Sequence, residues 1–136
     1  MIELTRAEPA DLPALMQWVD DPATFTQWSG PGFRYPFTPE SFAEDLLLER
    51  PSFILWESGE RVGFGQRYIR EGRSHMGRLV IAPQARARGL GTKLIGALLS
   101  LSEAQQRPEE CSLFVYRDNT QAAKLYRRMG FETAGY

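Results

Sequence analysis

The 136-residue chain is 43% hydrophobic and carries a formal net charge of −1 at neutral pH. Its length and apolar content predict one compact domain with a sizeable core and exclude a disordered or repeat protein. The near-neutral charge argues against nucleic acid as the main partner, since surfaces that bind a nucleic-acid backbone are normally strongly basic. No apolar run approaches membrane-spanning length and no signal pattern opens the chain, so we expect a soluble, cytoplasmic protein.

The predicted elements follow from the spacing of apolar residues and the positions of Gly, Pro and capping residues. Thr38 as N-cap and Pro39 in the first turn mark a helix start, and Gly59–Glu60 marks a hairpin turn. In chain order we expect a strand at residues 2–6, a helix at 11–19, a Trp-, Gly- and Pro-rich loop at 20–37, a helix from 39 to about 50, strands at 53–56, 62–69 and 74–81, a helix at 90–105, a strand at 111–116, a helix at 120–129 and a short strand at 131–136.

This order predicts the fold class. An antiparallel meander followed by strand–helix–strand is typical of an α+β (mixed α/β) fold, here in one domain over residues 1–136 with a central twisted mixed sheet flanked by helices. The final strand is short, so completion of the sheet edge by a second chain, as in a homodimer, stays open. The apolar stripe of the long helix should face the core and consists of Leu90, Leu94, Leu98 and Leu101.

The segment 79–94 carries the strongest functional signal. A β-branched run ends at Pro83, and a basic, glycine-containing turn over residues 86–92 then opens into a helix. Glycines let the backbone approach an anion, and the N–H groups at a helix start point toward it, so the segment predicts a site for a phosphate-bearing ligand. It is not a Walker loop, because Lys93 does not directly follow a glycine, and it is not a dinucleotide fingerprint, because Leu94 stands where a third glycine is needed.

Two motifs resemble those of the GCN5-related N-acetyltransferase (GNAT) family. The Arg-x-x-Gly-x-Gly pattern of residues 86–91 is similar to the family's Gln/Arg-x-x-Gly-x-Gly/Ala turn. Residues 115–131 resemble its second signature, in which a strand ends at an Asn, here Asn119, and a helix carries Ala-x-x-x-Tyr, here ending at Tyr126, before Gly-Phe. The helix is also expected from Asn119 as N-cap and Gly130 as C-terminal stop. The two motifs occur in the family's order and imply an N-acetyltransferase that moves an acetyl group from acetyl-coenzyme A to a primary amine.

The resemblance implies where acetyl-coenzyme A binds. It would lie in a wedge between the strand ending at Ile81 and the strand ending near Tyr116, where parting strands leave backbone groups for the pantetheine amides. A backbone N–H near Leu79 or Val80 would polarise the acetyl carbonyl, and the 86–92 turn would bind the pyrophosphate. The resemblance implies that the Asn119 side chain donates a hydrogen bond to the pantetheine, and a role as a plain helix N-cap fits this residue equally well. The implied cofactor-binding residues are Leu79, Val80, Ile81, Arg86, Ala87, Arg88, Gly89, Leu90, Gly91, Thr92, Asn119 and Tyr126.

Tyr126 and His75 are the candidate catalytic residues. The resemblance implies that the Tyr126 phenol protonates the departing thiolate; a packed core aromatic is the alternative. His75 lies four residues before Leu79 on one strand, so it shares the face of Leu79 unless a bulge intervenes, and its imidazole could take the proton of the amine. A partly exposed strand histidine without such a role is equally compatible. Glu71 and Glu57 are weaker candidates, and the role of a base could be vacant.

Aromatic residues of the segment 20–37 are the candidate acceptor site. In the family this region forms the substrate lip, and its rings could wall a pocket or simply pack beneath a long loop. The expected substrate-binding residues are Trp28, Phe33 and Tyr35, from a group that also includes Trp18, Phe25 and Phe37. Asp20, Asp21 and Asp45 could attract a cationic amine, and isolated surface carboxylates without such a role are the alternative. The acceptor stays open between a small-molecule and a peptide amine.

The remaining signals have simpler interpretations. Cys111 is the only cysteine, so it cannot form an internal disulfide, and we expect a buried thiol and not a nucleophile. No Cys/His cluster has ligand spacing, and no metal is expected. A non-catalytic acetyl-coenzyme A sensor, or an interaction module built on the aromatic segment, is the alternative to an enzyme. Tyr126 favours the enzyme, because a sensor does not need it.

Overall fold

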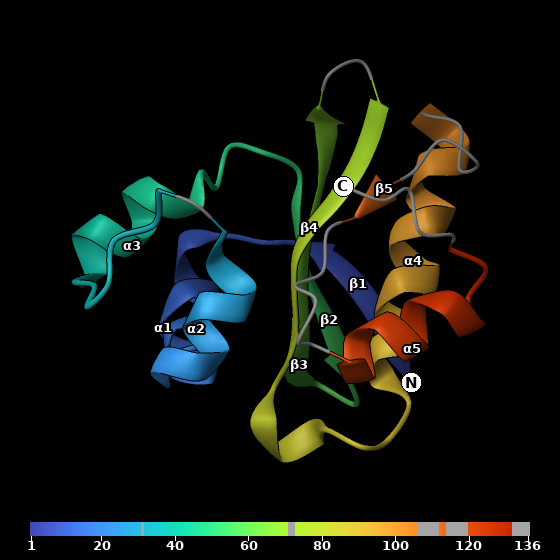
Figure 1. Cartoon of the computed structure of the whole chain (residues 1–136), viewed down its shortest axis with the longest axis horizontal. Coiled ribbons are helices and arrows are strands. Elements are labelled where there is room, and N and C mark those ends of the chain that lie inside the picture. The colour runs from blue at the N-terminus through green and yellow to red at the C-terminus, as the bar shows by residue number, and fades with distance from the viewer. Residues whose placement is uncertain (31, 71–72, 106–111, 114–119, 132–136) are drawn as a thin grey trace.

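One mixed sheet forms the centre of the molecule (Figure 1). This computed structural model describes residues 1–30, 32–70, 73–105, 112–113 and 120–131. The strands are β1 (Ile2–Arg6), β2 (Ser52–Glu57), β3 (Glu60–Arg70), β4 (Arg73–Ile81) and β5 (Ser112–Leu113). They lie side by side in chain order; β1 to β4 are antiparallel, and β5 runs parallel to β4. The predicted α+β fold with a central mixed sheet is confirmed.

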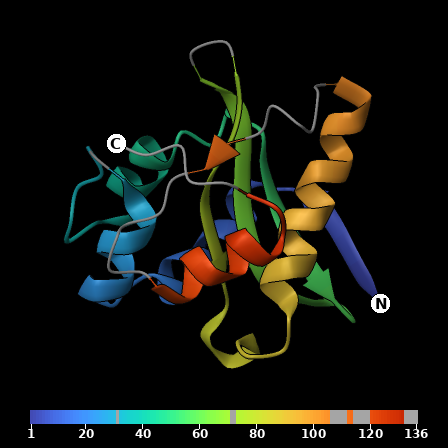
Figure 2. The same cartoon turned by 45° about the vertical axis from the view of Figure 1, so that its right-hand side comes forward.

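Helices cover both faces of the sheet (Figures 1 and 2). On one face lie α1 (Leu12–Trp18), α2 (Pro22–Ser29) and α3 (Pro39–Leu46); on the other lie α4 (Leu90–Gln105) and α5 (Thr120–Arg128). The predicted stripe of α4 is confirmed for Leu90, Leu94 and Leu98, which are at most 2% exposed, whereas the side chain of Leu101 is outside the described part. No helix in the described ranges has the length and apolar character to cross a membrane.

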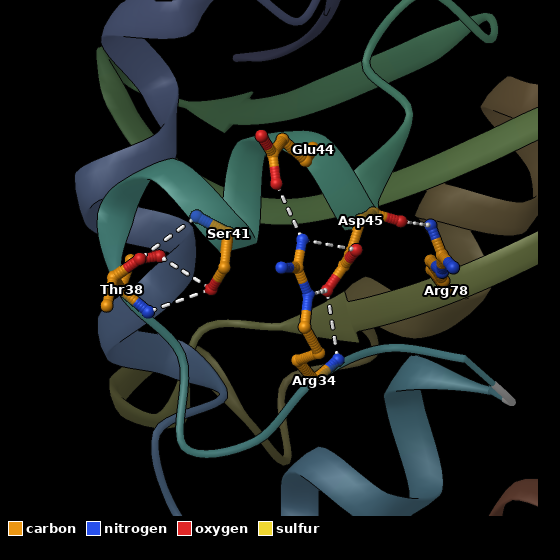
Figure 3. Close-up of polar contacts among 6 residues, drawn as sticks. All are labelled: Arg34, Thr38, Ser41, Glu44, Asp45 and Arg78. Atoms are coloured by element: carbon orange, nitrogen blue, oxygen red, sulfur yellow. Dashed lines mark hydrogen bonds and ion pairs between the residues drawn. The ribbon is translucent and has the colours of Figure 1, made fainter.

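The helix α3 begins as predicted but ends earlier. The Ser41 N–H donates to Thr38 Oγ1 at 3.0 Å and the Thr38 N–H donates to Ser41 Oγ at 2.9 Å, which forms a reciprocal cap (Figure 3). The helix ends at Leu46 and does not continue to Arg50, because Leu47 adopts the left-handed backbone conformation with φ 58°. This end turns the chain toward β2.

The segment 20–37, predicted as a loop, contains the helix α2. Asp21 caps it by accepting a hydrogen bond from the Thr24 N–H at 3.0 Å, and Pro22 occupies its first turn. The prediction of a loop was wrong here, because Phe25 and Trp28, only 3% and 6% exposed, pack into the core and stabilise a helix of modest intrinsic propensity.

A β-bulge interrupts β4. Its pairing with β3 shifts between Phe64 and Gln66, so that Gly65 stands opposite two residues of β4, Arg78 and Leu79. Arg78 has a φ of 52°, in the left-handed region that a non-glycine residue seldom adopts. A bulge leaves its extra residue outside the regular ladder, so this part of β4 has backbone groups that β3 does not pair.

The bulge places His75 and Leu79 on opposite faces of the sheet. His75 pairs with Tyr68 across the strands, on the face where the nearby Gln66 side chain donates to the Leu46 carbonyl of α3. Leu79 lies on the other face, beside α4. The expectation of a shared face is therefore wrong, because one added residue exchanges the two faces of a strand.

Candidate functional site

A pocket of about 100 Å³ opens between β4, α4 and α5, and Figure 2 shows α5 lying beside the first turns of α4. Its lining residues are Leu79, Val80, Ile81, Gly91, Leu94, Ile95, Leu125 and Tyr126. The pocket thus unites the end of β4 with residues of both sequence motifs, Gly91 of the first and Leu125 and Tyr126 of the second. Small-molecule sites usually measure about 300–1,000 Å³, so this pocket suits one end of a longer ligand.

Tyr126 is held in place by the way α5 ends. The Phe131 N–H donates to the Tyr126 carbonyl at 3.0 Å, the Gly130 N–H donates to the Arg127 carbonyl at 3.1 Å, and Gly130 has a φ of 98°. These are the bonds of a Schellman motif, and the apolar contact that usually accompanies it is made by the Tyr126 and Phe131 rings, 6.2 Å apart. Burial raises the pKa of Tyr126 above its ordinary value, so its phenol is protonated at neutral pH.

The 86–92 turn is an exposed, sharply bent segment before α4. Ala87 and Gly89 have φ angles of 65° and 75°, and nothing lies within 4 Å of a Cβ built on Gly89, so this glycine is needed for its backbone conformation. Gly91 instead faces α5, where a Cβ would lie 3.1 Å from Leu125 Cδ2. Arg88 and Thr92 are exposed and Leu90 is buried. The first N–H groups of α4 have no partner within their helix, which makes this turn suitable for an anion.

Both arginines of the turn have partners within the chain. Arg86 Nε donates to the Ile81 carbonyl at 3.2 Å, next to the end of β4. Arg88 forms an ion pair with Glu57 at the end of β2. Glu57, a weaker candidate for the base, therefore lies beside the turn and balances one of its cations.

His75 is 3% exposed, so the alternative of a partly exposed strand histidine is wrong. Its ring packs edge-on against the Tyr68 ring, with the centroids 5.5 Å apart. Because the bulge separates it from the face of Leu79, a catalytic role would require it to act from the face that α1 to α3 cover. That role stays a prediction.

The aromatic residues Trp28, Phe33 and Tyr35 belong to one packed cluster centred on Phe25. The ring centroids of Phe25 lie 6.1 Å from Trp28, 5.1 Å from Phe33 and 4.6 Å from Tyr35. Trp28 Nε1 donates to the Arg78 carbonyl at 2.7 Å, and 40% of Tyr35 is exposed. Trp28 thus supports the bulge of β4, and Tyr35 is the member of this trio that a ligand can reach most easily.

Arg78 was missed by the sequence analysis, because a single basic residue within the predicted strand 74–81 has no distinctive pattern and its partners are distant in the chain. Its Nε donates to the Ser29 carbonyl at 3.0 Å, and its Nη1 donates to the carbonyls of Asp45 at 3.2 Å and Leu46 at 2.7 Å. These oxygens lie at the C-terminal ends of α2 and α3, where helix dipoles favour a cation. Burial lowers the pKa of Arg78, and the carbonyls compensate the desolvated charge. One side chain therefore ties the bulge to two helices.

Asp45 is paired with Arg34 (Figure 3). Arg34 donates from Nε to Asp45 Oδ2 at 2.9 Å and from Nη2 to Oδ1 at 3.0 Å, and it also reaches Glu44 Oε1 at 2.6 Å. These bonds lower the pKa of Asp45. Because Arg34 balances its charge, Asp45 is a poor attractant for a cationic amine. Asn119, Cys111 and Glu71, also considered above, lie outside the described residues.

Known proteins share this sequence pattern. The sequence model of the Acetyltransferase (GNAT) family matches residues 13–131. The mycothiol acetyltransferase of Clavibacter sepedonicus is 38% identical over 89 residues, which are 65% of this chain and 27% of that protein. The peptidyl-lysine N-acetyltransferase YjaB of Salmonella typhimurium is 32% identical over 97 residues, 71% of this chain and 60% of that protein. The chain thus spans less than two thirds of either relative.

Solved structures share the fold. Aminoglycoside acetyltransferase AAC(6')-Ib in complex with coenzyme A superposes with a TM-score of 0.80 at 23% identity, over 99% of this chain and 86% of that one. The ribosomal-protein-S18-alanine N-acetyltransferase of Escherichia coli gives 0.72 at 21% identity, over 99% and 80%. Fold, pocket and family match agree, and the chain belongs to the GNAT acetyltransferase family.

Proposed function

We propose that this chain, acting as one domain, transfers the acetyl group of acetyl-coenzyme A to a primary amine by direct attack. The observation that carries the proposal is the pocket in which the end of β4, Gly91 of the first motif and Tyr126 of the second line one space. The names of the two relatives support an acyl transfer, and the coenzyme A complex of a protein with the same fold supports the cosubstrate.

Three parts of the site each bind a different part of acetyl-coenzyme A. Among the described residues β5 pairs with β4 only at His75 and Met76, so the backbone of residues 79–81 offers the groups on that edge of β4 to the pantetheine arm. An N–H at Leu79 or Val80 polarises the thioester carbonyl. The 86–92 turn and the N-terminus of α4 take the pyrophosphate. The pocket itself accommodates the acetyl end.

The reaction needs two proton movements. The unprotonated amine nitrogen attacks the carbonyl carbon, the C–S bond breaks, and the thiolate takes its proton from the Tyr126 hydroxyl. The raised pKa of Tyr126 keeps that proton available at neutral pH. The proton lost by the amine goes to His75 or to water, and the Tyr126 phenolate regains its proton from water before the next turnover. The aromatic cluster, through Trp28, Phe33 and Tyr35, forms the acceptor side.

A pair of glycine variants tests the cosubstrate site. Gly89 and Gly32 both have positive φ, 75° and 85°, and a Cβ on either meets nothing within 4 Å. Gly89→Val and Gly32→Val should therefore lose comparable stability, but only Gly89→Val should weaken acetyl-coenzyme A binding in isothermal titration calorimetry, because Gly32 lies in the α2–α3 connection. Equal affinities of the two variants would refute the assignment of the turn.

Release of free thiol distinguishes the enzyme from a sensor. A sensor binds acetyl-coenzyme A but releases no coenzyme A thiol in the presence of any amine, whereas the proposed enzyme releases it with at least one member of an amine panel. Binding without amine-dependent release would leave the cosubstrate site standing and refute the transfer.

A further inference from the structure

Arg50 and Tyr68 form a polar pair on the face of the sheet opposite the pocket. Both side chains are half-buried, and the Arg50 guanidinium lies 4.3 Å from the centroid of the Tyr68 ring. In the part of the chain that the structure describes, neither the guanidinium nor the Tyr68 hydroxyl makes a hydrogen bond or ion pair. Because both side chains are partly exposed, their donors are accessible to a ligand.

The pair lies where an acceptor would arrive. A Cβ on Gly77 would be 3.2 Å from Tyr68 Oη, so the hydroxyl lies directly over Gly77. Gly77 follows Met76, the last residue of β4 that pairs with β5 in the described ranges, and precedes the bulge at Arg78. The pocket lies on the α4 and α5 side of β4, so an amine that approaches the thioester from the opposite face of the sheet would pass this pair.

The charges around the pair favour an anion. Arg50 and Arg78 are close enough to act on one another electrostatically, because the positive charge of Arg50 contributes to the lowered pKa of Arg78. Asp45 also acts on Arg78, but its carboxylate is bound by Arg34 (Figure 3). A guanidinium presents paired N–H groups that match a carboxylate or phosphate, and a neighbouring phenol adds one donor.

From this arrangement we propose that the acceptor amine carries an anionic group, which the Arg50 guanidinium and the Tyr68 hydroxyl bind. The proposal rests on the proposed function, because it names the substrate class of the same site. A polycationic amine would meet two arginines on its approach and should be a poor acceptor.

A thiol-release assay with matched amines tests the acceptor class. The probes are amino acids and their amides, O-phosphoethanolamine and ethanolamine, and spermidine, compared at equal concentrations of unprotonated amine. We expect an amino acid to exceed its amide, or O-phosphoethanolamine to exceed ethanolamine, and the pair that responds tells carboxylate from phosphate. The acceptor class would be overturned, while the proposed function stands, if neither anionic probe released thiol faster than its uncharged partner, or if spermidine released thiol as fast as the better anionic probe. No release with any amine would overturn both.

Variants tie the preference to the pair. Arg50→Gln should raise the KM for the anionic acceptor by about 10- to 100-fold, the size of a lost charge-assisted hydrogen bond, and leave the KM for acetyl-coenzyme A unchanged. Tyr68→Phe keeps the ring under Arg50 and should give a smaller rise. Arg61→Gln is the control and should leave the KM for the anionic acceptor unchanged. Arg61 also lies over an aromatic ring, 4.8 Å from the centroid of Trp56, but its guanidinium is paired with Asp11. An unchanged KM for the anionic acceptor in both Arg50→Gln and Tyr68→Phe would overturn the proposal.

Discussion

Gly65 is a position at which one added carbon should disturb both the core and the pocket. It stands on β3 opposite the bulge, and a Cβ there would lie 2.7 Å from Leu79 Cδ2 and 2.9 Å from Leu98 Cδ1. Carbon atoms in good contact are about 3.5–4.0 Å apart, so both leucines would have to retreat by roughly 1 Å. Leu98 has no exposed surface, and Leu94 Cδ1 already lies 3.8 Å from the same point.

Gly65→Ala is therefore expected to lower the free energy of unfolding by about 1–3 kcal/mol, the usual effect of overpacking. Since Leu79 lines the pocket, its displacement should also weaken acetyl-coenzyme A binding. Urea denaturation followed by fluorescence measures the first effect, and calorimetric titration measures the second.

Gly96→Ala is the matched control. Gly96 lies inside α4, and a Cβ there meets nothing within 4 Å. Because alanine is the better helix former, this variant should gain about 0.5–1 kcal/mol. If Gly65→Ala unfolded at the urea concentration of the wild type or higher, the close approach of β3 to Leu79 and Leu98 would be refuted.

Three further predictions concern the bulge, the phenol and a helix start. Arg78→Met should lower the free energy of unfolding by about 3 kcal/mol or more, because three carbonyls lose a charged donor; an unchanged urea midpoint would contradict this. Tyr126→Phe should reduce turnover by about ten- to a thousand-fold with little change in cosubstrate affinity, and full turnover would make the tyrosine a packing residue. Burial raises the pKa of Tyr126 in the folded protein above the ordinary value of 10.0. The contribution of the neutral phenol to stability is therefore complete below pH 10.0 and is lost as the pH rises through the folded pKa. In urea titrations at alkaline pH, Tyr126→Phe should lose less stability with rising pH than the wild type. Thr38→Ala should lower the free energy of unfolding by about 0.5–2 kcal/mol through loss of the α3 cap, and a midpoint equal to that of the wild type would show that the cap is dispensable.

Much of the fold could be predicted from residues that are neighbours in the chain. The bounds of β1 and of α4, at 2–6 and 90–105, agree with the structure, and Thr38 caps α3 as expected. The same holds for the end of α5, where Gly130 and Phe131 close the Schellman motif on Tyr126. Apolar periodicity and helix capping depend on residues only a few positions apart, so a short stretch of sequence is enough to predict them.

Contacts between distant segments decided the rest. Asp21–Pro22 is the same kind of start signal as Thr38–Pro39, but α2 also needed the burial of its aromatic face, which only the folded chain supplies. The bulge has no sequence signature, because a left-handed arginine is held there by carbonyls of α2 and α3, more than 30 residues earlier in the chain. That one inserted residue put His75 and Leu79 on opposite faces, since strand periodicity predicts a face only while the register is unbroken.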